Sequence, residues 1–113
     1  MKKPEFTDTL GEFEQAVLLA LLRHGDQAYG TVIHRELEAR LQRVVSASAV
    51  YATLDRMEDK GYVRSRIGEP THERGGRRRR YFRLAPAGAQ ALSHAYRNFK
   101  QLVQGLERSL EKL

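Results

Sequence analysis

The stretch that decides the fold is residues 46–61, Ser46-Ala47-Ser48-Ala49-Val50-Tyr51-Ala52-Thr53-Leu54-Asp55-Arg56-Met57-Glu58-Asp59-Lys60-Gly61. A serine before an apolar-periodic run is a good helix N-cap and a glycine after it is a good terminator, so these residues predict a helix over 47–60. Val50, Leu54 and Met57 are spaced by four and three residues and would form its buried stripe. The small and hydroxyl-bearing residues at its start are left on other faces.

Two helices are predicted before this one. Residues 29–41 have helical spacing of their apolar side chains, which are Val32, Ile33, Leu37 and Leu41. Residues 12–24 are apolar nearly all round, because Leu18, Leu19 and Leu22 widen the stripe of Phe13, Val17, Ala20 and Leu21. Such a helix must be covered on two sides, by its own domain and by something else. The short connection between helices 29–41 and 47–60 is typical of a helix-turn-helix.

A basic β-hairpin is predicted after the helices. Residues 62–67 and 78–84 alternate with period two around a loop that contains glycine and proline. No acidic residue occurs between Glu73 and Glu107, so eight Arg and Lys side chains in that interval lack a nearby partner in the sequence. A helix-turn-helix followed by a basic hairpin is the winged-helix arrangement, in which the second helix enters a major groove and the hairpin reaches phosphates or the minor groove.

The C-terminal residues predict a long helix over 86–111, with Pro86 as its first residue. Apolar side chains recur as an a/d heptad seam at Leu92, Tyr96, Phe99, Val103, Leu106, Leu110 and Leu113. The helix would be roughly 40 Å long, too long to bury its seam on so small a domain. Gly105 in its interior would mark a close approach or a bend.

The seam has two possible partners, the 12–24 helix of the same chain and a second copy, and we expect both. The predicted interface residues are Phe13, Val17, Leu18, Leu22, Leu92, Tyr96, Phe99, Val103, Leu106 and Leu110. Tyr96 and Phe99 would also suit a cavity for a small hydrophobic or aromatic effector, although aromatic residues at this spacing are more often plain core. The predicted fold class is mainly α (α+β), with a winged helix-turn-helix DNA-binding domain over 1–84 and a dimerisation helix over 85–113.

The charge pattern favours double-stranded DNA as a partner. The formal net charge of +6 only permits nucleic-acid binding, and the clustering of the arginines argues for it. The expected contacts are Ser46, Ser48, Tyr51, Arg56, Lys60, Arg64, Arg66, Arg74, Arg77, Arg78, Arg79 and Arg80. Because Asp55, Glu58 and Asp59 lie further along the helix, readout should concentrate at its start. Plainer alternatives remain: a solvated arginine loop, a core role for Tyr51, and pairing of Arg56 and Lys60 with those acids.

Other classes of protein find little support. Without cysteine the chain has no disulfides or thiolate metal sites, and His24, His34, His72 and His94 are scattered, so we expect no metal, no cofactor and no enzyme. The apolar run 16–22 is too short to span a membrane, and acidic residues precede it, unlike in a signal peptide. We expect a cytoplasmic protein without a membrane segment.

One set of motifs runs through nearly the whole chain: Leu10-Gly11-Glu12-Phe13-Glu14, Val17 to Leu22, Ala28-Tyr29-Gly30, Ala49 to Arg56, Lys60-Gly61, Arg74-Gly75-Gly76-Arg77, Arg80-Tyr81 and Pro86-Ala87-Gly88. In these residues the chain resembles the PadR family of bacterial transcription regulators. The single C-terminal helix looks like the compact subgroup, which dimerises through that helix and the N-terminal one. The chain departs from the family at Ala85, where a threonine N-cap is common, and in having no tryptophan, around which some compact members build a drug pocket.

The resemblance implies a homodimeric regulator, usually a repressor, which often leaves DNA when a small molecule binds. It also implies that Tyr51 contacts the DNA backbone. The two-fold symmetry of such a dimer predicts a pseudo-palindromic operator. The alternative function is a protein-interaction module, in which the seam docks a partner's helix and the arginines meet an acidic surface.

Overall fold

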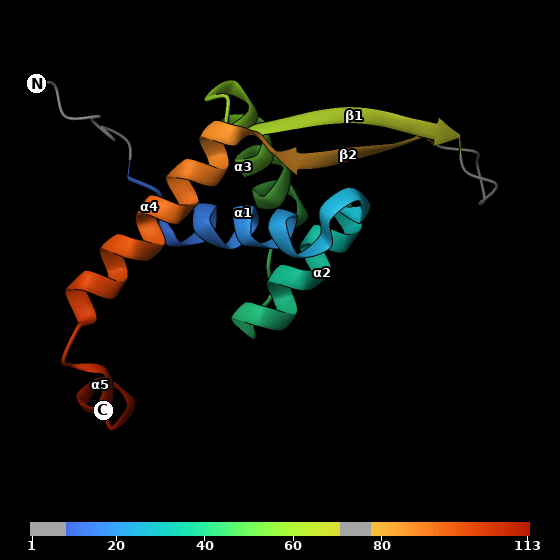
Figure 1. The fold of residues 1–113 in the computed structure, drawn as a ribbon. Coiled ribbons are helices and arrows are strands. Elements are labelled where there is room, and N and C mark those ends of the chain that lie inside the picture. Colours follow the sequence, from blue (N-terminus) through green and yellow to red (C-terminus); the bar gives the residue numbers. More distant parts are fainter. Residues whose placement is uncertain (1–8, 71–77) are drawn as a thin grey trace, which may run out of the picture.

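The computed structural model describes residues 9–70 and 78–113, and within them the chain is mainly helical with a two-stranded antiparallel sheet. Its body is formed by α1 (Glu12–His24), a 3₁₀ turn η1 (Gly25–Gln27), α2 (Gly30–Leu41) and α3 (Ala47–Asp59). A hairpin of β1 (Val63–Pro70) and β2 (Arg78–Leu84) follows, then α4 (Pro86–Val103) and α5 (Glu107–Glu111). The hairpin and α4 leave the body in different directions (Figure 1). The predicted winged helix-turn-helix is confirmed.

The core is built around α1, which contacts α2, α3, α4 and β2. Val17, Leu18 and Leu21 of α1 are at most 2% exposed. The stripe predicted for α3 is confirmed, because its three side chains, Val50, Leu54 and Met57, are fully buried. Leu19 and Leu22 lie on the other side of α1 and remain 47% and 65% exposed. The body therefore covers one side of α1 and leaves the other open.

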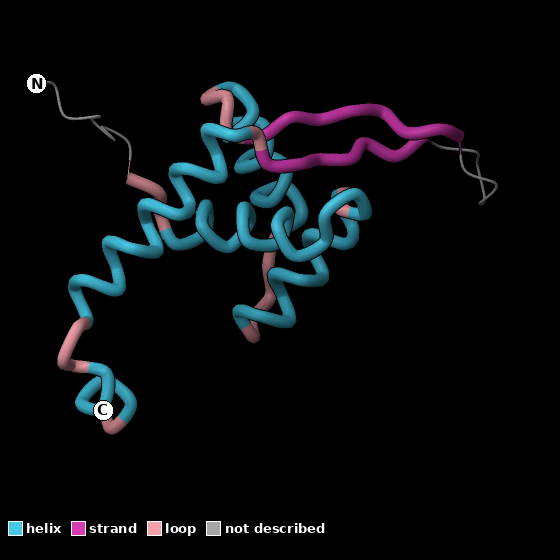
Figure 2. The backbone as a smooth tube through the Cα atoms, viewed as in Figure 1, coloured by secondary structure: helices cyan, strands magenta, loops and turns pink. Residues whose placement is uncertain are grey.

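The hairpin is anchored to the body at one end and extends away from it at the other (Figure 2). Val63 pairs with Leu84 and Ser65 with Phe82, which places buried Val63 and Phe82 on the face towards the helices. The segment after η1 extends the sheet, since the Phe82 N–H donates to the Ala28 carbonyl at 2.8 Å and Tyr29 bridges to Tyr81. This pairing fixes the base of the hairpin, here called the wing, against α1.

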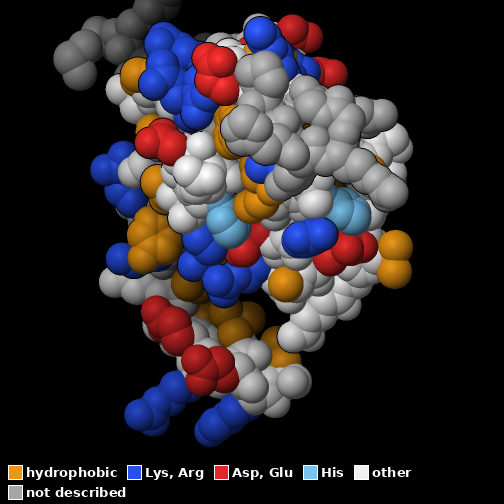
Figure 3. All heavy atoms as spheres, turned by 90° about the vertical axis from the view of Figure 1, so that its right-hand side faces the viewer, with side chains coloured by type: hydrophobic (Ala, Val, Ile, Leu, Met, Phe, Trp, Pro, Cys, Tyr) orange, Lys and Arg blue, Asp and Glu red, His pale blue; other side chains and the backbone are white. Residues whose placement is uncertain are grey.

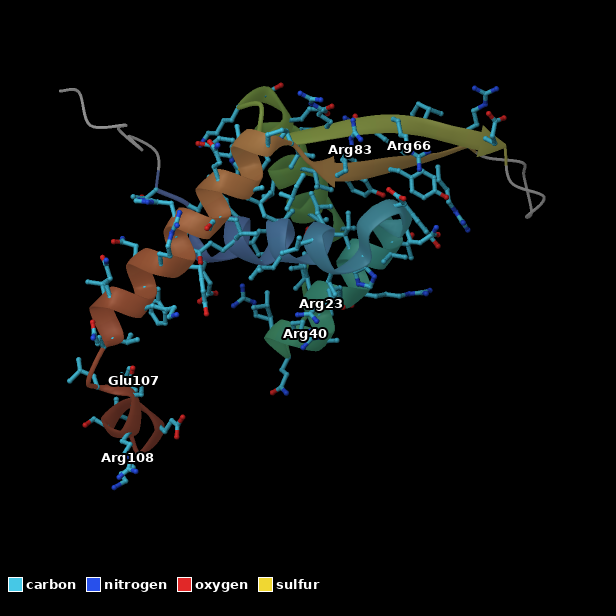
Figure 4. The ribbon with its side chains drawn as sticks, viewed as in Figure 1. Arg23, Arg40, Arg66, Arg83, Glu107 and Arg108 are labelled. Atoms are coloured by element: carbon cyan, nitrogen blue, oxygen red, sulfur yellow. The ribbon has the colours of Figure 1, made fainter. Side chains whose placement is uncertain are left out.

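The predicted single helix over 86–111 is wrong in its second half. α4 ends at Val103, Gly105 has a φ of +84°, and α5 begins at Glu107. The left-handed backbone at Gly105 breaks the helix, a conformation that glycine adopts at little cost. Leu106 and Leu110 therefore do not continue the α4 seam, although the heptad spacing in the sequence does. In Figure 4 the labelled Glu107 and Arg108 of α5 lie beyond the free end of α4.

α4 starts in close contact with the end of α3. The Ala85 N–H donates to the Tyr62 carbonyl oxygen at 2.9 Å, and Pro86 opens the helix as predicted. A Cβ atom at Gly88 would lie 2.0 Å from that same carbonyl oxygen. Gly88 is thus needed because backbone meets backbone there. None of the helices within the described residues is long and apolar enough to cross a membrane.

A charged cluster on the surface ties α1 to α2. Glu36 of α2 accepts from Arg40 at 2.7 Å and lies 3.1 Å from both Arg23 and His24 of α1. Arg23 and Arg40 come together beneath α1 in Figure 4. The hydrogen bond from Arg40, followed by that from His24, lowers the pKa of Glu36 from its ordinary value of 4.5 against the opposing effect of burial.

We expect Gly88→Ala to destabilise the protein by roughly 1–3 kcal/mol, because the new methyl group overlaps a carbonyl that cannot retreat. The sign of the change in unfolding free energy distinguishes this site from an ordinary one, because replacing glycine with alanine inside a helix usually stabilises a protein by roughly 0.5–1 kcal/mol. Urea denaturation measures the difference. Ala87→Ser at the exposed neighbouring position is the matched control and should stay within about 0.5 kcal/mol of the parent. A stabilised Gly88→Ala variant would contradict the close approach.

Glu36→Gln should be less stable than the parent at pH 7 by about 1 kcal/mol, the scale for an ion pair with exposed partners. A carboxylate whose folded pKa is lowered stabilises the fold above its unfolded pKa and loses this effect as the pH falls through the folded pKa. The difference between the two proteins should therefore shrink below pH about 4. Thermal unfolding from pH 3 to 7 measures it, with exposed Glu12→Gln as the control. A difference that is independent of pH would rule out the ionic contribution.

Candidate nucleic-acid interface

The N-terminus of α3 carries the predicted serine cap. Ser46 Oγ accepts from the Ala49 N–H at 3.2 Å and lies 2.7 Å from Ser48 Oγ. Both serines are exposed. Of the two hydroxyl protons, the bond between the serines uses one, so the pair can still donate to an external acceptor.

Tyr51 lies across the start of α2. A Cβ atom at Gly30 would be 1.8 Å from the Tyr51 hydroxyl oxygen, so the glycine makes room for the tyrosine ring. Tyr51 is 44% exposed, which makes the core alternative for it wrong. The contact brings the Tyr51 hydroxyl to the first turn of α2, beside the serine-capped end of the next helix. The sequence did not predict that Gly30 makes room for the Tyr51 ring.

Two side chains of α2 hold the turn between α2 and α3. Glu38 Oε2 accepts from the Val45 N–H at 3.1 Å, and His34 Nε2 lies 2.6 Å from the Val45 carbonyl oxygen. Val45 is buried, whereas its neighbour Val44 is 91% exposed. We call His34, Glu38 and the Val45 backbone the turn clamp. Sequence reasoning missed it, and the signal was the i,i+4 spacing of His34 and Glu38 just before a helix-turn-helix connection.

Arg80, one of the predicted DNA contacts, is paired with carboxylates of α3. Its guanidinium lies 3.3 Å from Asp55 Oδ1 and 2.5 Å from Glu58 Oε1, both on α3. Ser65 of β1 donates to the other oxygen of Glu58 at 2.7 Å. The positive charge of Arg80 is therefore neutralised by carboxylates, and its role is to tie the wing to α3. We call these four side chains the Arg80 cluster.

The far half of α3 is also engaged with the body. Arg56 Nη2 lies 3.5 Å from Glu14 Oε2 of α1, so it pairs with an acid, although not with one of its own helix as the plainer alternative had it. Lys60 is exposed at the C-terminal cap. Because Arg56 is paired and Asp55, Glu58 and Asp59 carry negative charge, this half of α3 up to Asp59 is poorly suited to a phosphate backbone. The serine-bearing end is the better candidate.

The outward face of the wing is basic. The register places Arg64 opposite Arg83 and Arg66 opposite Tyr81, on the face turned away from Val63 and Phe82. Arg66 and Arg83 are labelled on the sheet in Figure 4. The Arg66 guanidinium lies 4.6 Å from the Tyr81 ring centroid, and that of Arg79 lies 4.3 Å from the Tyr29 ring centroid. These cation–π contacts orient the two guanidinium groups on the wing.

Of the other arginines predicted to contact DNA from the wing, one lies within the described residues and two do not. Arg78 is exposed at the start of β2. Arg74 and Arg77 lie outside the described residues. Seen from the wing side, Lys and Arg side chains are spread over the visible surface with Asp and Glu among them (Figure 3). The outward face of the wing also includes three residues that were not among the predicted DNA contacts, namely Arg83, Tyr29 and Tyr81.

The predicted dimer-interface residues fall into three groups by exposure. Leu22, Tyr96, Phe99, Leu106 and Leu110 are 46–65% exposed. Phe13 and Val103 are half-buried. Leu92 is 8% exposed, and Val17 and Leu18 are fully buried. The expectation for Val17 and Leu18 is wrong, because they fill the core of a single chain and have no surface to offer, whereas Leu19, which was not selected, is exposed.

An apolar groove of about 370 Å³ lies between α1 and α4. Leu19 and Leu22 line one wall and Leu92, Tyr96 and Phe99 the other. The groove joins the open side of α1 to the seam of α4. No group of His, Cys, Asp and Glu that could hold a metal ion occurs in residues 9–70 and 78–113.

The chain is similar to a family of known regulators. A model of the transcriptional regulator PadR-like family matches residues 18–94. A PadR-like transcription factor from Bacteroides fragilis has a TM-score of 0.69 and 21% identity, covering 85% of this chain and 87% of that one. A transcriptional regulator from Clostridium thermocellum has a TM-score of 0.65 and 24% identity, covering 85% and 88%. A PadR family transcription regulator from Clostridium difficile R20291 has a TM-score of 0.64 and 22% identity, covering 87% and 98%.

At these identities the likeness to solved structures shows the fold. None of the curated proteins matches the chain significantly.

Arg80→Ala and Arg78→Ala should behave differently although both remove one positive charge. Arg80→Ala should lower the unfolding free energy by about 1 kcal/mol, because Asp55 and Glu58 lose their partner, and leave the salt dependence of duplex binding nearly unchanged. Arg78→Ala should leave stability within about 0.5 kcal/mol of the parent and reduce the slope of log K against log salt by about 0.9. Urea denaturation and salt titration of duplex binding separate the two. Equal losses of slope would show that Arg80 leaves its carboxylates to bind phosphate.

Proposed function

The chain belongs to the PadR-like family of transcriptional regulators, which bind DNA, and we propose that it acts as a homodimeric repressor on a pseudo-palindromic operator. Each copy would place α3 in a major groove and the wing along the adjacent backbone. A dimer bound at a promoter would repress by occupying it. The family is one of regulators and not of enzymes.

The dimer is supported above all by the apolar surface that a single chain leaves uncovered. Tyr96 and Phe99 of α4 are each 62% exposed, and Leu102 is 70% exposed. On α1, Leu22 is 65% exposed on the opposite wall of the same groove. Contiguous apolar surface of this kind marks an interaction site in a water-soluble protein. A second copy related by two-fold symmetry would cover both surfaces at once.

The DNA contacts we propose are the exposed side chains of Ser46, Ser48, Tyr51, Lys60, Arg64, Arg66 and Arg78, together with the half-buried Arg79. Arg74 and Arg77 remain in the proposal from the sequence alone. Serine hydroxyls and the N-terminus of α3 would position that helix, while the arginines supply the salt-dependent part of the affinity. Half-sites should lie one helical turn, about 34 Å, or a multiple of it apart.

A small hydrophobic or aromatic effector fits the groove between α1 and α4. Its volume of about 370 Å³ and its wall of leucine, tyrosine and phenylalanine side chains suit an apolar ligand of modest size. A ligand there would change the distance between the two α3 helices of a dimer, because the groove lies between the body and the proposed dimerisation helix. It would release DNA only by binding better to a dimer that cannot span both half-sites.

Phe99→Glu should abolish dimerisation, because a carboxylate would be buried without a partner at the centre of the seam. Sedimentation equilibrium should show a dimer for the parent and a monomer for this variant, with operator affinity reduced at least 100-fold because a monomer contacts one half-site. Gln90→Glu adds the same charge on the opposite face of α4 and is the matched control. A Phe99→Glu variant that remains dimeric and still binds operator would overturn the proposed interface.

A further inference from the structure

The outward face of α3 carries short side chains. Between Ser46 and Asp55 the sequence has no Arg, Lys, Asn or Gln, the residues that make bidentate hydrogen bonds with guanine or adenine. Ser48, Ala49 and Ala52 are exposed in their place. Asp55, the next polar side chain along the helix, lies 3.3 Å from Arg80. Hydrogen bonds from long side chains therefore contribute little to base recognition at this end of the helix.

Val44 adds an exposed apolar side chain in the turn that precedes α3. It is 91% exposed, whereas Val45 beside it is 6% exposed and turns inward. The turn clamp holds both the N–H and the carbonyl of Val45, at 3.1 and 2.6 Å. Because that backbone is fixed, Val44 has a fixed direction away from the core, two residues before the Ser46 cap. An exposed valine held in place is suited to contact with an apolar group from outside.

In a major groove that apolar group is the C5-methyl of thymine, which alanine and other methyl-bearing side chains contact. We infer that the protein identifies its operator through thymine methyl groups in each half-site, contacted by Val44, Ala49 and Ala52. The inference rests on the proposed function, since it requires α3 to lie in the major groove. The small side chains have a second effect, because they let the helix backbone approach the base edges closely.

The expected loss of affinity when one thymine is replaced is modest, and the losses at several bases multiply. Burying one methyl group against an apolar partner changes Kd by about fourfold. Cytosine and uracil present no methyl group at C5, whereas 5-methylcytosine does. Uracil keeps the O4 acceptor and the pairing edge of thymine, so replacing thymine with uracil removes the methyl group alone.

The experiment begins with duplexes selected from a random pool by the purified full-length chain. Each thymine of the selected half-site is then replaced singly with uracil, and Kd is measured at fixed salt. We expect at least one thymine in each half-site to show about a fourfold loss of affinity. Uracil in the spacer between half-sites is the DNA control and should have no effect.

Protein variants assign the contact to a side chain. In Val44→Ala the uracil penalty at one base should fall below about twofold, because the two γ-methyl groups of valine that would reach the thymine methyl are gone. The fold should be unaffected, since Val44 is 91% exposed. Ile67→Ala is the matched control, an apolar side chain on the wing that is 58% exposed, and should leave the uracil penalties as they are in the parent.

The outcomes separate this inference from the proposed function. A selected operator whose half-site thymines all tolerate uracil would overturn the inference while leaving the proposed function intact. Uracil penalties that persist in each of Val44→Ala, Ala49→Gly and Ala52→Gly would overturn the assignment to these side chains. A pool that yields no enriched sequence would instead contradict the proposed function itself.

Discussion

The rest of the structure depends on the burial of α1. This helix is apolar on almost every side, and α2, α3, β2 and α4 all pack against it. Val17, Leu18 and Leu21 face the body and are nearly completely buried, each contributing about 1.5–3 kcal/mol of transfer free energy. Leu19 and Leu22 face the other way and form a wall of the groove beside α4. One side of α1 thus forms the centre of the core. The other side presents the apolar surface against which a second copy would pack.

Short polar contacts then set the position of α3 within this body. The turn clamp fixes its entry, the ring of Tyr51 rests on Gly30, and the Arg80 cluster joins its second half to the wing. Side chains as small as serine and alanine have little reach of their own. A helix that recognised bases with such side chains would have to be placed accurately by its surroundings, and these contacts hold α3 in place.

Much of this could be predicted from the sequence, because local signals specify elements. The 12–24 helix and the 78–84 strand were predicted with the boundaries that the structure shows, since a glycine and a period-two pattern mark their ends. The single C-terminal helix was not, because the heptad spacing continues through Gly105 while the backbone there turns left-handed. Val17 and Leu18 were wrongly assigned to the dimer interface. Helical periodicity shows which side chains share an apolar face, but it does not show whether the same chain or a second copy covers that face.

By itself the sequence determined the order of the elements, the helix-turn-helix, the basic wing and an excess of apolar surface on the first and last helices. Only the tertiary structure decided which arginines are paired with carboxylates and which leucines stay exposed. Arg80 shows why: its carboxylates are 25 and 22 residues away in the chain and meet it only when the wing folds against α3. Local patterns report on neighbours in sequence, whereas charge neutralisation and burial are set by neighbours in space.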